Sequence, residues 1–191
     1  MADVLIILAP GAEEIETMAV GDVLVRAGQS VTVASSSQDL VVPGSRGLPL
    51  AAHCRLSETA GRSFDLVYLP GGMGSATTCS EDPRIQDLLQ ARFAAQQPVA
   101  IICASVLALL PRHLGQGRHV TSFPGVRAKL EGHVASWRDQ AVVEDGALVT
   151  SQGPGTAISL GLVLARRLAG QATAATVAAA MLVPMPSALP A

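Results

Sequence analysis

The chain has little charge and few aromatic residues. Only 15% of its 191 residues are charged and 3% are aromatic, whereas 49% are hydrophobic. This balance argues against an intrinsically disordered chain, because disorder needs low hydrophobicity and many charges. The formal net charge of −2 offers no basic surface, so we expect no direct nucleic-acid binding.

Cysteine is also scarce, with Cys54, Cys79 and Cys103 as the only three. An odd number without a CxxC pair argues against a disulfide framework or a zinc ribbon and favours a reducing compartment. We therefore expect a cytoplasmic protein without a structural metal. His53 stands beside Cys54, but no further ligands are spaced to complete a metal site, and His113, His119 and His133 are isolated.

Long hydrophobic runs are missing as well. No apolar stretch reaches about 18 residues without a polar or charged break, the length that a membrane span requires. The first apolar run, in MADVLIILAPGAEE, is short, follows no basic residue and precedes acids. We expect neither a signal peptide nor a membrane partner.

Predicted strands and helices alternate along the chain. Apolar runs bounded by turn residues predict strands at residues 3–9, 30–35, 64–72 and 98–103, with shorter strands between 39 and 56. Helical spacing predicts helices at residues 14–28, 83–96, 155–170 and 171–182, and another directly after Cys103. This order predicts a single α/β domain with a mostly parallel sheet over residues 1–183, followed by a proline-rich tail at 184–191.

Cys103, in AIICASVLALL, follows a predicted buried strand and precedes a predicted helix. Open parallel sheets bind ligands at the carboxyl ends of their strands. A cysteine on such a turn resembles a hydrolase nucleophile elbow, and the N–H groups of a helix start favour the thiolate. The alternative is an inert buried cysteine that acts as a small hydrophobe. Cys79 falls in a polar loop, where we expect exposure and incidental oxidation.

Two further features gather at strand ends. Glu13 and Glu14 stand in the first turn of a helix, where acids complement the helix dipole. Glu16 lies near the apolar face, and burial there favours a neutral carboxyl that donates a hydrogen bond to a thiolate. After the glycine turn in LPGGMGS, the N–H groups of Gly72 and Ala104 are candidates to hold a developing oxyanion.

Five motifs occur together and in order: LAPGAEEIE, LPGGMG, AIICAS, TSFPG and TSQGPGTA. Their order and spacing resemble the ThiJ/PfpI family over residues 3–183, and within it the bacterial YajL branch. The resemblance implies a flavodoxin-like sandwich with helices on both faces, a homodimer and no cofactor.

The resemblance also implies roles for particular residues. Cys103 matches a nucleophile that is readily oxidised to a sulfinate, and Glu16 matches a protonated glutamate hydrogen-bonded to that sulfur. Gly71, Gly72 and Ala104 match the backbone groups that line an anion pocket. In the family, arginines matching Arg26 and Arg46 lie near the dimer interface. We expect the helix at residues 14–28 to join that interface, because its apolar residues extend beyond one stripe, with Met18, Ala19 and Val20 in a row.

The chain departs from the family pattern at two places. Phe123 stands where many members have a histidine, so this segment offers no Cys–His dyad. The elbow sequence carries bulkier residues, including Ser105, and we expect Ser105 and Phe123 to line the pocket.

Two functions from different classes follow. One is a cofactor-independent glyoxalase or deglycase that acts through Cys103 and Glu16 on methylglyoxal, glyoxal or their protein or nucleotide adducts. The alternative is a non-enzymatic stress-response protein or chaperone that is switched when Cys103 becomes a sulfinate. A binding or scaffold role is a third reading, because the fold alone does not choose among them.

Overall fold

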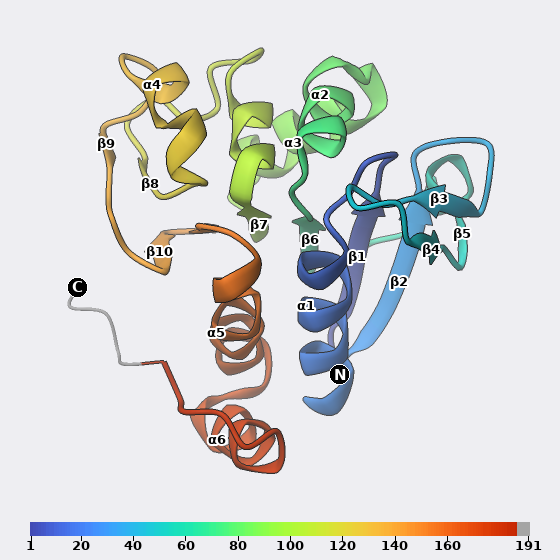
Figure 1. Ribbon diagram of the computed structural model, residues 1–191, viewed down its shortest axis with the longest axis vertical. Coiled ribbons are helices and arrows are strands. Elements are labelled where there is room, and N and C mark those ends of the chain that lie inside the picture. Colours follow the sequence, from blue (N-terminus) through green and yellow to red (C-terminus); the bar gives the residue numbers. More distant parts are fainter. Residues whose placement is uncertain (187–191) are drawn as a thin grey trace.

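The computed structural model describes residues 1–186, and a seven-stranded sheet runs through its centre (Figure 1). The strands lie in the order β10-β11-β7-β6-β1-β2-β5. Their bounds are Asp3–Leu8 for β1, Ser30–Ser35 for β2, Cys54–Arg55 for β5, Leu66–Leu69 for β6, Val99–Ile102 for β7, Val142–Asp145 for β10 and Leu148–Ser151 for β11. Every neighbouring pair is parallel except the β10–β11 hairpin. The predicted α/β fold with a mostly parallel sheet is confirmed.

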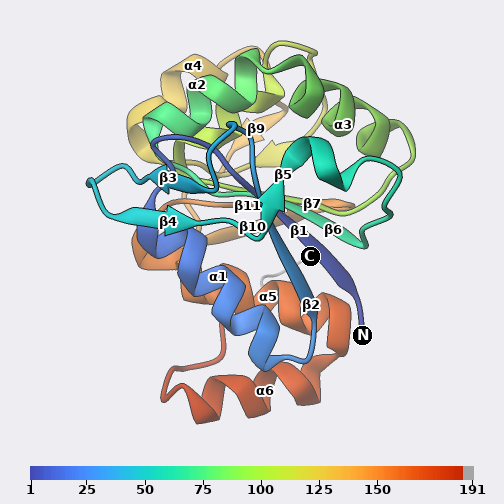
Figure 2. The ribbon, with the colours of Figure 1, turned by 90° about the vertical axis from the view of Figure 1, so that its right-hand side faces the viewer.

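Helices cover both faces of the sheet (Figure 2). Their bounds are Glu14–Arg26 for α1, Met73–Glu81 for α2, Pro83–Ala94 for α3, Arg127–Leu130 for α4, Ala157–Ala169 for α5 and Gln171–Ala180 for α6. On one face α1 and α5 pack against Val4 and Ile6 of β1, and on the other α3 packs against Leu5 and Ile7. This division follows from the two-residue alternation of side chains along a strand. Helix α6 packs outside α1 and α5 as a further layer.

Shorter elements complete the molecule. Strands β3 (Val41–Pro43) and β4 (Pro49–Ala51) form an antiparallel hairpin, and β8 (His119–Val120) pairs with β9 (Ser136–Trp137) in parallel. The 3-10 helices are η1 Leu56–Thr59, η2 Cys103–Leu109, η3 Pro124–Val126 and η4 Pro154–Thr156. The predicted proline-rich tail at 184–191 lies largely outside the described residues. Within residues 1–186, no helix has both the length and the apolar character needed to cross a membrane.

The helix predicted after Cys103 is present as the 3-10 helix η2. One sequence prediction is wrong, because residues 73–81 form helix α2 although they read as a turn and a polar loop. The sequence MGSATTCSE is a weak helix former because it contains glycine, serine and threonine. Contacts with η2 and the Gly72 turn, rather than propensity, therefore place α2.

The outer face of α1 also differs from the prediction. Val20 is fully buried, whereas Met18 is 60% and Ile15 57% exposed. Residues two apart in a helix point to nearly opposite sides, so Met18 and Val20 do not share a surface. Val20 belongs to the core, and Ile15 and Met18 form the exposed apolar face of this helix.

Candidate active site

Cys103 lies where β7 ends, at a strained point of the backbone. Its φ angle is +62°, in the left-handed region that residues with a side chain rarely adopt. Strand β7 ends at Ile102 and η2 begins at Cys103 itself. Strain of this kind persists only where the surroundings hold it, and it concentrates at functional sites. The turn has the geometry of a nucleophile elbow.

Gly71 and Gly72 allow the loop after β6 to pass very close to this cysteine. A side chain at Gly71 would overlap both the Cβ atom of Cys103 and Oε2 of Glu16. Gly72 has a φ angle of +91°, and a side chain there would overlap the carbonyl oxygen of Gly11. Glycine is therefore required at both positions, and it lets the backbone of this loop approach Cys103 and Glu16 closely.

Glu16 is fully buried in the first turn of α1 and faces Cys103. Its Oε2 atom accepts a hydrogen bond of 2.7 Å from the N–H of Gly71, and its carboxyl group lies within hydrogen-bonding reach of the thiol. Its other oxygen, Oε1, meets no hydrogen-bond donor in good geometry. A buried carboxylate with one oxygen bare of donors is costly, so this arrangement favours the neutral acid.

The proton equilibrium of Glu16 follows from this environment. Burial raises the pKa of Glu16 from 4.5 to about 7, hydrogen bonds with Cys103 and Gly71 oppose the rise, and the charge of Glu13 adds to it. The carboxyl therefore gains and loses a proton near neutral pH. This agrees with the prediction of a neutral carboxyl next to the thiol.

The protonation state of the Cys103 thiol differs from the one that the sequence predicts. Burial and the charge of Glu16 raise the pKa of Cys103 to about 12, while the N–H groups of Gly72 and Ala104 lower it. The expected thiolate at a helix start is not the resting form, because the sulfur is buried beside a carboxyl. The repulsion from Glu16 vanishes once Glu16 is protonated, so the two groups titrate as a pair that shares a proton. The thiolate forms when that proton resides on Glu16.

The three predicted anion-pocket groups divide into two kinds. The N–H groups of Gly72 and Ala104 lie close enough to Cys103 to lower the pKa of its thiol. Both are placed to stabilise negative charge on the sulfur or on an oxygen bound close to it. Gly71 does not join them, because its N–H is already bonded to Glu16.

A cavity of about 400 Å³ opens beside Cys103. Its walls include Phe123, as predicted, and the exposed side chain of Met73, while Arg46 contributes a cation. The other lining residues are Gly11, Glu13, Gly44, Ser45, Gly72, Gly74, Ala104 and Pro154. The cavity lies at the carboxyl end of β7, where ligands bind in parallel sheets.

Ser105 does not line this cavity, contrary to prediction. Its side chain is fully buried, and its hydroxyl donates a hydrogen bond of 2.6 Å to the carbonyl oxygen of Pro70. A 3-10 helix has three residues per turn, so a residue two positions after Cys103 faces away from it. Ser105 supports the glycine loop from behind.

The other cysteines and the histidines lie elsewhere. Cys79 is fully buried on α2, and burial raises its pKa to about 12, so the prediction of an exposed loop cysteine is wrong. His53 accepts a hydrogen bond from the N–H of Val33, and His119 is bonded to Ser136. The rings of His113 and His133 stack with their centroids 6.5 Å apart. Within residues 1–186, no group of three or more His, Cys, Asp or Glu side chains is arranged to hold a metal ion.

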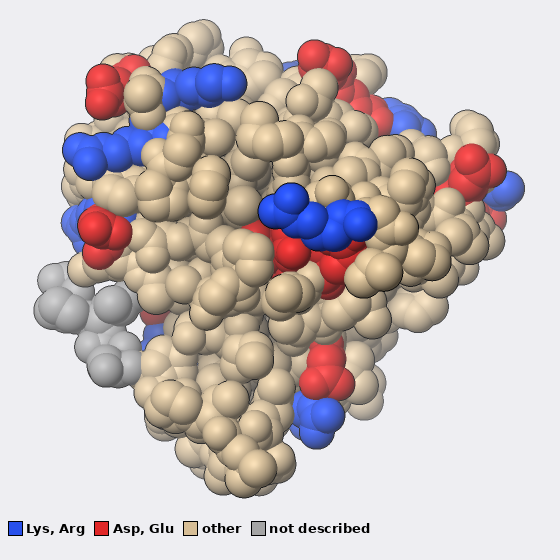
Figure 3. Space-filling model, in the orientation of Figure 1, with Lys and Arg blue, Asp and Glu red and all other residues tan. Residues whose placement is uncertain are grey.

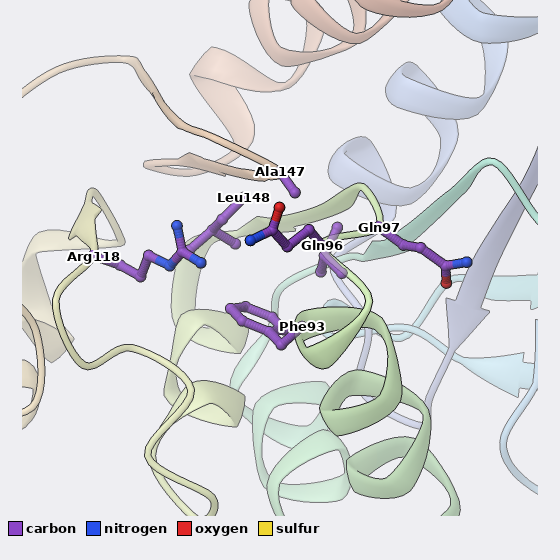
Figure 4. A pocket seen from close by; sticks show the side chains of 7 residues that line it. Phe93, Gln96, Gln97, Arg118, Ala147 and Leu148 are labelled. Carbon is purple, nitrogen blue, oxygen red and sulfur yellow. The ribbon is translucent and has the colours of Figure 1, made fainter.

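A second cavity lies at the opposite end of the sheet (Figure 4). Phe93, Arg118 and Leu148 surround a space of about 10 Å³, enough for roughly one water molecule. It adjoins Val99 and Leu148, the first residues of β7 and β11. Because this is the amino end of the strands, the Cys103 cavity is the better candidate for an active site.

Sequence reasoning missed two buried groups that support the site. The hydroxyl of Tyr68 donates a hydrogen bond of 3.0 Å to the carbonyl oxygen of Glu16, which ties β6 to α1. The hydroxyl of Ser75 donates to the carbonyl oxygen of Pro70, also at 3.0 Å. A tyrosine within an apolar strand is a signal in itself, since a buried phenol needs a polar partner. Ser75 gave no comparable signal.

Comparisons with known proteins agree on the same relatives. The model of the DJ-1/PfpI family matches residues 2–167. Protein dj-1beta of Drosophila melanogaster is 38% identical over 179 residues, which cover 94% of this chain and 96% of that protein. Its crystal structure matches with a TM-score of 0.93 over 96% of this chain and 98% of that chain.

Two further relatives carry informative names. The glutathione-independent glyoxalase DJR-1.2 of Caenorhabditis elegans is 34% identical over 167 residues, 87% of this chain and 88% of that protein. Toxoplasma gondii DJ-1, solved in an oxidized form, is 30% identical with a TM-score of 0.90 and covers 96% of this chain and 99% of that chain. The nearer likeness to the YajL branch stays a prediction.

The raised pKa of Glu16 makes stability depend on pH. The folded state holds this proton more tightly than the unfolded state, so the contribution is complete below pH 4.5 and is lost as pH rises through about 7. The shift from 4.5 to about 7 corresponds to roughly 3 kcal/mol. We expect Glu16→Gln, which does not titrate, to lose this part of the pH dependence. Urea unfolding of both proteins across this range measures the difference, and parallel curves would contradict the assignment.

Proposed function

The chain belongs to the DJ-1/PfpI family, and we propose that it is a cofactor-independent glyoxalase or deglycase that acts through Cys103 on small dicarbonyl compounds or their adducts. One observation carries the proposal. A buried carboxyl that titrates near neutral pH faces a strained cysteine at the wall of a 400 Å³ cavity. The glyoxalase name of the C. elegans relative supports the same reaction class.

The proposed chemistry needs only groups already placed at the site. When the shared proton is on Glu16, the sulfur of Cys103 adds to the aldehyde carbon of methylglyoxal and forms a carbon–sulfur bond. The aldehyde oxygen becomes an oxyanion, which the N–H groups of Gly72 and Ala104 stabilise before Glu16 supplies a proton. The product of this step is a hemithioacetal.

The remaining steps move one proton and add one water. Glu16 removes the proton from the hemithioacetal carbon and returns it to the neighbouring carbon, which converts the adduct to a thioester. Water then cleaves the carbon–sulfur bond and releases lactate. Methylglyoxal plus water equals lactic acid in atoms and electrons, so no external oxidant or reductant is required. Phe123 stands where the family resemblance implies a histidine, so the base is Glu16, water or a residue from elsewhere, and the proposal assigns the proton transfers to Glu16 because it faces Cys103.

Redox regulation is the second candidate, and a different property of the same site favours it. A protonated Glu16 is placed to donate a hydrogen bond to an oxygen bound to the sulfur of Cys103. Two molecules of hydrogen peroxide convert a thiol to a sulfinic acid and release two waters. Oxidation would place a permanent negative charge in the cavity and alter a stress-response or chaperone activity.

We also propose that the protein is a homodimer in the cytoplasm, with the exposed face of α1 in the interface. Ile15, Met18 and Val25 are each more than half exposed, and Leu48 is 62% exposed on the loop that Glu14 anchors to this helix. Figure 3 shows this face of the molecule, on which charged side chains gather in small groups with uncharged surface between them. An apolar helix face of this kind fits a second copy of the same surface. Arg26 is the last residue of α1 and forms an ion pair with Asp22 of the same helix.

Lactate production from methylglyoxal tests the enzymatic proposal. We expect Cys103→Ala to abolish the rate above the buffer- and amine-catalysed background, and Glu16→Gln to lower kcat by about 10²–10⁴-fold, because proton transfer is lost. Cys54→Ala, which changes a cysteine that does not line the cavity, is the matched control. Equal rates in the wild type and Cys103→Ala would exclude this activity.

Limited oxidation with peroxide tests the redox proposal. Cys103 should form a sulfinic acid before Cys54 and Cys79, since Cys79 is fully buried and only Cys103 lines the cavity. Glu16→Leu should form less sulfinate, because the stabilising hydrogen bond is absent. Peptide mass spectrometry locates the added oxygens, and earlier oxidation of either other cysteine would overturn the assignment.

Light scattering tests the dimer. At micromolar concentration the mass should equal two chains of 19.5 kDa. Met18→Asp should lower it toward one chain while the melting temperature stays close to that of the wild-type subunit. Val20→Asp should instead unfold the subunit, because it buries a charge in the core. A wild-type mass of one chain, or an unaltered mass in Met18→Asp, would contradict the proposed interface.

A further inference from the structure

We propose that Ser105 is a positioning residue whose hydroxyl polarises the peptide unit between Pro70 and Gly71, and so controls how firmly Glu16 holds the proton that it shares with Cys103. The inference concerns the same site as the proposed function and assigns it a regulating group. It starts from a continuous chain of hydrogen bonds.

The chain of hydrogen bonds passes through a single peptide unit. The carbonyl oxygen of Pro70 accepts two hydroxyl groups, that of Ser105 at 2.6 Å and that of Ser75 at 3.0 Å. The N–H of the same unit, on Gly71, donates to Oε2 of Glu16 at 2.7 Å. Both serine side chains are fully buried, so water does not compete for these bonds.

The peptide unit transmits the effect of the hydroxyls. Its carbonyl and N–H are joined by resonance, so a hydrogen bond donated to the oxygen makes the N–H a stronger donor. Such chains of hydrogen bonds strengthen one another by roughly 10–30% per bond. A stronger N–H stabilises an ionised carboxylate more than a neutral acid, and the hydroxyl of Ser105 therefore loosens the proton on Glu16.

The N–H of Gly71 is one of the two hydrogen-bond partners that favour ionisation of Glu16. The titratable groups that act on Glu16 are Glu13 from the start of α1, Tyr68 from β6 and Cys103 from η2. Glu13 opposes ionisation of Glu16, and none of the three is a cation. The hydrogen bonds that favour ionisation come from Cys103 and Gly71. The strength of the Gly71 donor therefore affects which member of the pair carries the proton.

Alkylation of Cys103 by iodoacetamide across pH tests the inference. Peptide mass spectrometry gives the rate at Cys103 alone, and its midpoint reports the first proton lost from the pair. In Ser105→Ala the midpoint should move to higher pH by about 0.3 unit, because Gly71 becomes a weaker donor. Ser75→Ala, which removes a longer bond, should move it less, and the double variant should move it further than either.

Ser80→Ala is the matched control. Ser80 belongs to the same helix as Ser75, but its hydroxyl bonds to the carbonyl oxygen of Ala76 within that helix. The midpoint of Cys103 alkylation in Ser80→Ala should equal that of the wild type. Ser105→Ala should fold, because the Pro70 carbonyl keeps its bond from Ser75 and no buried acceptor is left bare.

Direct titration of Glu16 provides the second measurement. The ¹³C resonance of its carboxyl, identified by its loss in Glu16→Gln, should show the same upward shift in Ser105→Ala. Unshifted midpoints in both measurements, or an equal shift in Ser80→Ala, would overturn the inference. Alkylation needs no turnover, so a protein that makes no lactate but shows these shifts would refute the proposed activity and leave the inference standing.

Discussion

The buried contact between the carboxyl of Glu16 and the thiol of Cys103 is the constraint on which the site depends. Two acidic groups that meet in a buried site need the backbone beside them brought unusually close. Gly71 provides that approach, because a side chain there would overlap both groups. The left-handed backbone at Cys103 and the phenol bond from Tyr68 to the first turn of α1 hold the two partners in place. Strain at one residue is offset by packing around it.

Proton placement, rather than a strongly acidic thiol, gives this site its chemistry. Burial disfavours negative charge on either group, so the pair loses its first proton only near pH 7 and above that pH keeps one proton and one negative charge. Two backbone N–H groups, from Gly72 and Ala104, favour negative charge on the sulfur by lowering the pKa of the thiol. The same property suits addition to a carbonyl and stabilisation of an oxidised sulfur, which explains why both functions arise from one geometry.

Most of the fold could be read from periodicity alone. The strands at 3–8, 30–35, 66–69 and 99–102 and the helices α1, α3, α5 and α6 fall within or close to the predicted ranges. The failures share one cause. Helix α2 and the 3-10 form of η2 depend on contacts between the two segments, and the burial of Cys79 follows from that packing. Local propensity carries no information about such contacts.

The sequence by itself determined the alternation of strands and helices, the place of Cys103 at a strand end and the candidacy of Glu16, because each rests on the order of neighbouring residues. Tertiary structure decided what those groups meet. It turned the N–H of Gly71 away from the anion pocket and toward Glu16, and it placed Ser105 behind the elbow instead of in the cavity. It also raised the pKa of Cys103, where a helix start alone would have lowered it. The directions in which these groups point, their burial and the distances between them arise only when segments distant in sequence pack together. These properties set the proton equilibrium between Glu16 and Cys103.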